Sequence, residues 1–108
     1  MATTYKVLGQ LLPASTTGDL YTVPAATETV VSTINVVNTG TTNSTIRIAI
    51  RPNGAAIETK HYIVYDIVIN PSVTFTYTSG LTMDASDVLT VSSTNSNCAF
   101  SAFGSEVA

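Results

Sequence analysis

Hydrophobic and polar positions alternate most regularly in this chain between residues 45 and 51. Isoleucine occupies every second position, and the intervening positions carry polar or small side chains: Ile46, Ile48 and Ile50 against Thr45, Arg47, Ala49 and Arg51. A period of two residues is typical of a β-strand with one face in a core and the other facing water or a partner. The pattern therefore predicts a half-buried strand over residues 45–51.

The preceding segment, residues 30–37, is dense in β-branched side chains, which suit a pleated, half-buried surface. Asn38-Thr39-Gly40 lies between the two segments, and both Asn and Gly tolerate the positive φ of a turn. Residues 30–51 are accordingly predicted to form a β-hairpin around which the rest of the chain is organised.

Short apolar runs separated by turn signals continue along the remaining sequence. The run over 61–69 has apolar residues on both faces, which predicts either a central strand covered on both sides or a strand at a subunit contact. The predicted strands are 5–12, 20–23, 30–37, 45–51, 61–69, 73–78, 88–91 and 99–103, with a crossover at 81–87 and a tail at 104–108.

This spacing, without a helical period, predicts an all-β fold. We expect one domain over residues 1–108, a single antiparallel β-sandwich or barrel of about seven to eight short strands. The core should contain large residues that alternate with Thr, Ser and Arg, namely Val36, Ile46, Ile48, Ile50, Phe75, Leu89 and Phe100.

Charge is sparse in this sequence. Charged residues make up 10% of the chain, against roughly 25% in ordinary soluble domains, and the mean hydropathy is +0.31. Low charge removes the repulsion that keeps monomers apart. We therefore favour a surface covered by copies of the chain or by a lattice over a merely weakly charged monomer. A net charge of −3 with four basic residues argues against direct contact with nucleic acid.

No segment approaches the roughly 18 consecutive apolar residues of a membrane span, and the N-terminal sequence lacks the pattern of a secretory signal. The longest apolar run, 62–69, is interrupted by Asp66. We expect no membrane partner and synthesis in the cytoplasm.

His61 is the only histidine, and therefore the only side chain with an unperturbed pKa near neutrality. No Ser, Cys or Asp stands at a recognisable triad spacing from it, although triads assemble in space. A structural or contact role is favoured over catalysis. Cys98 is the only cysteine, so an intrachain disulfide and a cysteine-based metal cluster are excluded, and a buried apolar role is favoured. We expect neither enzyme activity nor a cofactor.

Asp84 and Asp87 fall in one loop, and Glu28 and Glu58 are further carboxylates that the fold could bring within reach. Calcium takes six or more oxygen ligands, for which two aspartates are weak evidence. Asp87 is favoured as a turn residue whose carboxylate accepts backbone N–H groups before the next strand. No metal site is predicted.

Two features bear on glycans. Asn43-Ser44-Thr45 matches the N-glycosylation pattern, as expected by chance in a chain rich in Ser and Thr. Tyrosine rings can stack on sugars, but without tryptophan, packing in the core or at an interface is favoured for most of Tyr5, Tyr21, Tyr62, Tyr65 and Tyr77.

Several motifs resemble those of small virion proteins of tailed bacteriophages. The first group is Leu20-Tyr21-Thr22-Val23-Pro24-Ala25, Val30-Val31-Ser32-Thr33-Ile34 and Val37-Asn38. The second is residues 47–51, Lys60-His61-Tyr62-Ile63, Tyr65-Asp66, Asp87-Val88-Leu89-Thr90-Val91 and Phe103-Gly104-Ser105-Glu106. The likeness runs from about residue 5 to the C-terminus, and none of these motifs is a catalytic signature.

The resemblance implies a β-sandwich structural protein of the virion, most of all a capsid decoration (cement) protein. Such a protein would form a closed oligomer, a trimer by analogy, and would clamp neighbouring major capsid protein subunits. Two alternatives stay open: a tail, baseplate or fibre accessory subunit, and a glycan-binding module that uses exposed tyrosines and polar loops such as 92–97.

The predicted interface lies on the non-core side of the strand at 45–51 and on the run that follows residue 60. Arg47 and Arg51 carry planar guanidinium groups suited to carboxylates, and we expect at least one of them to contact another subunit. His61, Tyr62 and Tyr65 complete the predicted interface residues.

Overall fold

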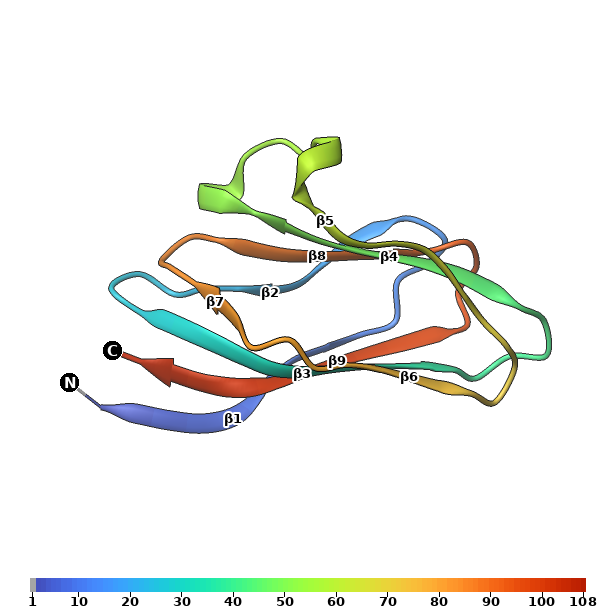
Figure 1. Cartoon of the computed structure of the whole chain (residues 1–108), viewed down its shortest axis with the longest axis horizontal. Coiled ribbons are helices and arrows are strands. Elements are labelled where there is room, and N and C mark those ends of the chain that lie inside the picture. The colour runs from blue at the N-terminus through green and yellow to red at the C-terminus, as the bar shows by residue number, and fades with distance from the viewer. Residues whose placement is uncertain (1) are drawn as a thin grey trace.

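A computed structural model describes residues 2–108, which form two antiparallel sheets packed face to face (Figure 1). Sheet A has the order β1–β9–β3–β6, with β7 also paired to β3. Its strands are β1 (Thr3–Leu11), β3 (Glu28–Asn38), β6 (Thr74–Tyr77), β7 (Leu81–Met83) and β9 (Cys98–Val107). Sheet B has the order β2–β8–β4–β5, formed by β2 (Thr17–Thr22), β4 (Ser44–Arg51), β5 (Tyr62–Ile69) and β8 (Val88–Ser93).

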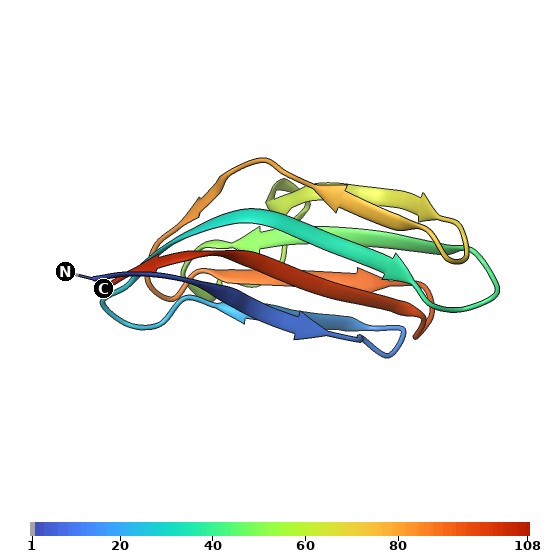
Figure 2. The same ribbon diagram turned by 90° about the horizontal axis from the view of Figure 1, so that it is seen from below.

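The predicted antiparallel β-sandwich is confirmed, as two separate sheets rather than a closed barrel. The described residues form nine strands, not seven to eight, because β7 lies within the predicted crossover at 81–87. The predicted tail at 104–108 is also wrong, since β9 continues to Val107 and pairs with β1 on one side and β3 on the other. Figure 2 shows these three strands side by side, and beyond them Ala2 and Ala108 hydrogen-bond each other through their backbones.

The predicted hairpin over residues 30–51 is wrong. β3 pairs with β9, β6 and β7, whereas β4 pairs with β5 and β8, so the chain crosses from sheet A to sheet B between Asn38 and Ser44. Two successive strands with one apolar face each can lie side by side in one sheet or face each other across a core. Both arrangements place the apolar faces in the core. The buried side chain of Asn38 holds the crossing, because its Nδ2 donates to the carbonyl oxygens of Thr42 (2.8 Å) and Ile69 (2.9 Å).

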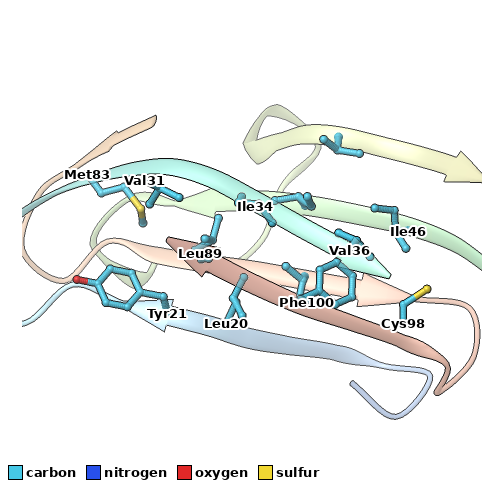
Figure 3. Packing of buried hydrophobic residues seen from close by; sticks show 14 of the residues in the cluster. Leu20, Tyr21, Val31, Ile34, Val36, Ile46, Met83, Leu89, Cys98 and Phe100 are labelled. Carbon is cyan, nitrogen blue, oxygen red and sulfur yellow. The ribbon is translucent and has the colours of Figure 1, made fainter. Parts of the chain in front are cut away.

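The core lies between the two sheets, and Figure 3 shows buried side chains from both sheets meeting there. Ile50 and Phe75 depart from the prediction, being only partly buried: Ile50 lies near the end of β4, and Phe75 on the edge strand β6. The other predicted core residues are confirmed as buried, namely Val36, Ile46, Ile48, Leu89 and Phe100.

A polar bridge connects the sheets near the chain ends. The buried Tyr21 hydroxyl on β2 hydrogen-bonds Thr29 Oγ1 on β3 at 2.8 Å and donates to the Glu106 carboxylate on β9. Lys6 Nζ lies 2.8 Å from the same carboxylate. Burial, followed by the hydrogen bond to Glu106, raises the pKa of Tyr21 to about 12, and the contacts with Lys6 and Tyr21 lower the pKa of Glu106.

We expect Tyr21→Phe to lower the free energy of unfolding by about 1–3 kcal/mol, because it leaves the buried Thr29 hydroxyl without this partner. Urea unfolding at pH 7 measures the loss, and Tyr77→Phe, at a half-buried tyrosine, is the control. Glu106 has a lowered folded-state pKa, so its contribution is present above its unfolded value of about 4.3 and is lost as pH falls through the folded value. The Tyr21→Phe deficit should therefore shrink in acid, and an equal deficit in both tyrosine variants would contradict the bridge.

Candidate interaction surface

Among residues 2–108, β5 pairs with β4 alone and is the edge strand of sheet B, so the central-strand alternative is wrong. Apolar residues lie on both faces of β5, and several of them are exposed to solvent: Tyr65 is 53% exposed, Ile67 38% and Val68 59%. Val73, in the turn that follows, is 45% exposed. We call these four residues the β5 edge. A long apolar edge strand presents unpaired backbone groups and apolar side chains together, which is a template for association with another chain.

A second apolar edge lies on the other side of the sandwich. β1 is the edge strand of sheet A next to β9, and it lies beside β2, whereas β5 is at the far end of the β2–β8–β4–β5 order. Tyr5 is 83% exposed, Val7 50% and Leu12, directly after the strand, 55%. We call these three residues the β1 edge. The molecule thus carries exposed apolar side chains along two opposite sides.

Arg47, Tyr62, Tyr65 and Asp66 form one cluster, the Arg47 cluster, on the outer face of sheet B. Arg47 pairs with Asp66 through two hydrogen bonds, from Nε to Oδ1 (2.6 Å) and from Nη2 to Oδ2 (3.3 Å). Its guanidinium carbon lies 4.1 Å from the Tyr65 ring centroid and 5.8 Å from that of Tyr62, within cation–π range. The two rings meet edge to face, with centroids 5.0 Å apart. The bond to Asp66 also raises the pKa of Arg47.

A backbone irregularity places Asp66 in this cluster. Asp66 has φ of 55°, in the left-handed region that Asp tolerates better than most residues. The register of β4 and β5 shifts there, with Ile46 opposite Ile67 but Arg47 opposite Tyr65, so Asp66 is the extra residue of a β-bulge. Sequence reasoning missed this role, although a single Asp inside an apolar run was the available signal.

A shallow polar groove of about 260 Å³ runs beside the Arg47 cluster. One row of cross-strand neighbours crosses sheet B here: Thr17 on β2, Ser92 on β8, Arg47 on β4 and Tyr65 on β5. Arg47 and Asp66 line one part of the groove, and serine and threonine residues line the rest: Ser15, Thr16, Thr17, Thr45, Ser92, Ser93 and Thr94.

Arg51 is engaged within its own chain. Its guanidinium donates to Asp19 Oδ1 at 3.1 Å, to Thr90 Oγ1 at 3.0 Å and to the carbonyl oxygens of Gly54 and Ala55. These bonds fix the start of the 52–61 segment, which contains the 3₁₀ turns η1 (Pro52–Gly54) and η2 (Thr59–His61) and rises above sheet B in Figure 1. The structure therefore supplies an intrachain role for Arg51.

His61 ends the same segment and is buried. Its Nδ1 accepts a hydrogen bond from the Glu58 backbone N–H at 3.0 Å, and its own backbone N–H donates to the Glu58 carbonyl oxygen. The neutral ring consequently carries its proton on Nε2. His61 is buried and its ring hydrogen-bonds Glu58, whereas the predicted interface residues Arg47, Tyr62 and Tyr65 lie together.

The carboxylates considered for calcium are only partly brought together. Glu28, Asp84 and Asp87 line one hollow, while Glu58 lines another beside His61. Asp87 accepts backbone N–H groups from Asn53 (2.8 Å) and Asp84 (2.9 Å), which confirms its prediction as a turn residue. Within residues 2–108, no group of three or more His, Cys, Asp or Glu side chains is arranged to hold a metal ion.

The remaining candidates have separate places in the fold. Cys98 is fully buried in the core as a free thiol, as predicted. Tyr21 is buried and Tyr77 partly buried, so the tyrosines do not form one sugar-binding row. Ser44, the middle residue of the glycosylation pattern, is buried, and its hydroxyl donates to Asn95.

Comparisons with protein families, with characterised proteins and with solved structures give no match to this chain. In the part of the chain that the structure describes, no helix has the length and apolar character needed to cross a membrane.

Proposed function

We propose that this chain is a structural subunit of a bacteriophage virion, a capsid decoration protein that acts as a symmetric oligomer and binds neighbouring major capsid protein subunits. The observation that carries this proposal is the pair of apolar edges on opposite sides of one small sandwich. The phage-like motifs supply the setting, as a resemblance.

Two different edges favour a head-to-tail arrangement. A contact between unlike surfaces leaves one free copy of each surface on the pair, so further copies add until a ring closes or a filament grows. Contact between the β5 edge of one copy and the β1 edge of the next would cover both edges in a closed ring, and a ring of three agrees with the trimer expected by analogy.

The charged residues near the two apolar edges are compatible with association between identical copies. Arg47 and Asp66 neutralise each other, and Lys6, on β1, is paired with Glu106. Apolar side chains can then meet without strong repulsion between like charges, and burial of apolar area contributes roughly 25 cal/mol per Å².

The position of such an oligomer on the particle is a separate question. A tail, baseplate or fibre subunit could use the same edges, and copy number distinguishes it from a decoration protein. Hundreds of copies per particle agree with the shell, and a few to dozens agree with a tail.

We expect the recombinant protein to sediment as three copies of the 11.3 kDa chain. Added to shells that lack it, it should bind at many sites and raise the temperature at which the shells break. Analytical ultracentrifugation and light scattering of heated shells measure the two effects, with a heat-unfolded sample as the control. A stable monomer that ignores shells and binds tail fractions would overturn the proposal.

A further inference from the structure

The groove beside the Arg47 cluster is lined by one ion pair and by serine and threonine residues. Its charged pair, Arg47 and Asp66, is neutral in sum and held planar by two hydrogen bonds, and the other lining residues are serines and threonines, of which Ser93 is buried with its hydroxyl donating to the Asn95 carbonyl oxygen. A groove of this composition offers donors and acceptors without net charge, so it favours a neutral polyhydroxy ligand over phosphate or a cation. We propose that this groove binds a neutral glycan, with Arg47 and Asp66 bonding adjacent hydroxyls of one sugar ring.

The Arg47 side chain is preorganised for this role. Tyr65 supports one face of the guanidinium at 4.1 Å, and Asp66 fixes its orientation, so little side-chain freedom is lost when a ligand binds. A guanidinium has five N–H donors, of which Asp66 takes two, so donors remain for a sugar hydroxyl. Asp66 is a two-oxygen acceptor with lone pairs left for another hydroxyl.

The volume of the groove limits the size of the ligand, and its position determines which strands would contact that ligand. About 260 Å³ is below the roughly 300–1,000 Å³ of pockets that enclose drug-sized ligands, so the groove suits one sugar ring of a longer chain lying along the sheet. It lies on the outer face of sheet B, among β2, β4, β5 and β8, and it adjoins the β5 edge, because Tyr65 belongs to that edge and groove residue Thr45 lies opposite Val68. All of the residues that line the groove come from one copy of the chain, so the site is complete without the proposed oligomer.

The experiment begins with the purified wild-type protein on an array of oligosaccharides of glucose, galactose, mannose and N-acetylglucosamine, with sialylated and sulfated glycans included as charged probes. Saturable binding to a neutral oligosaccharide is expected. Titration with that oligosaccharide should shift backbone amide signals of residues 15–17, 45–47 and 92–94. No saturable neutral binder, or retention of charged glycans alone, would overturn the proposal.

Two variants then locate the site. Arg47→Ala should weaken binding about tenfold or more, and Thr45→Val, which removes one hydroxyl while keeping side-chain shape, about two- to tenfold. Thr76→Val makes the same change on the exposed face of β6 and should bind as the wild type does. Thermal unfolding and sedimentation of each variant show whether fold and assembly are kept. Unchanged affinity in folded Arg47→Ala and Thr45→Val would overturn the assignment.

Discussion

Replacement of Gly104 by alanine is expected to lower the free energy of unfolding by about 3 kcal/mol or more, the upper part of the range for overpacking. Gly104 lies on β9 between Lys6 on β1 and Val31 on β3. A Cβ at this position would lie 1.9 Å from the Val30 carbonyl oxygen and 3.0 Å from the Val30 carbonyl carbon. Both are backbone atoms of the neighbouring strand, so no side-chain rotation can relieve the contact, and β3 and β9 must separate.

Thermal unfolding measures the effect. For a domain of this size a loss of 1 kcal/mol lowers Tm by roughly 4–8 °C, so we expect Tm to fall by about 12–24 °C or more. Gly18→Ala is the matched control, because its added Cβ meets Leu11 Cδ2 at 2.7 Å, the end of a flexible side chain that can move. A Gly104→Ala variant within about 1 kcal/mol of the wild type would contradict the predicted close packing of β3 and β9.

The close approach of Gly104 to Val30 could not be predicted from the sequence, because it depends on strand register. The motif Phe103-Gly104-Ser105-Glu106 is visible as a string, but the closeness of Gly104 to Val30 depends on the register of β9 against β3. Those two segments are about 70 residues apart in the sequence, and no local pattern specifies their register. The sequence pattern therefore ended the last strand at residue 103, whereas pairing on both sides extends β9 to Val107.

The alternation of apolar and polar residues predicted which strand faces are buried better than it predicted which strands pair with each other. Ile46 and Ile48 are in the core, as their period of two requires. The same period is satisfied whether residues 30–38 pair beside β4 or stack across the core from it, and the structure has the second arrangement. For β5, apolar residues on both faces were compatible with a central strand or with an exposed contact surface, and the structure places it at an edge.

The groove could not be predicted from sequence for the same reason. Thr17, Ser92 and Arg47 are separate, ordinary residues in the chain, and only the pairing of β2, β8 and β4 makes them neighbours. Arg47 itself was identified as exposed and polar because it interrupts a run of isoleucines. Its partner Asp66 was visible as an interruption in an apolar run, but the bulge that turns it toward Arg47 is a property of the pair of strands.

Lysine on either apolar edge is expected to dissociate the proposed oligomer into folded monomers. Val68→Lys changes the β5 edge and Val7→Lys the β1 edge, both at well-exposed positions where a lysine leaves the monomer fold intact. In the assembled form the new charge would be buried without a partner, at a cost of about 3 kcal/mol or more per contact, which corresponds to more than 100-fold weaker association. Sedimentation velocity over a range of concentrations measures the change.

Ile57→Lys is the matched control, because Ile57 is 40% exposed on the segment above sheet B and lies on neither edge. It should assemble as the wild type does. The decisive sample is a mixture of the Val68→Lys and Val7→Lys proteins. In a head-to-tail contact, the intact β5 edge of one variant binds the intact β1 edge of the other, while the two lysine-bearing edges repel, so the mixture should stop at a dimer. If Val68→Lys alone disrupts assembly and Val7→Lys does not, the contact joins two β5 edges, and the proposed ring is wrong.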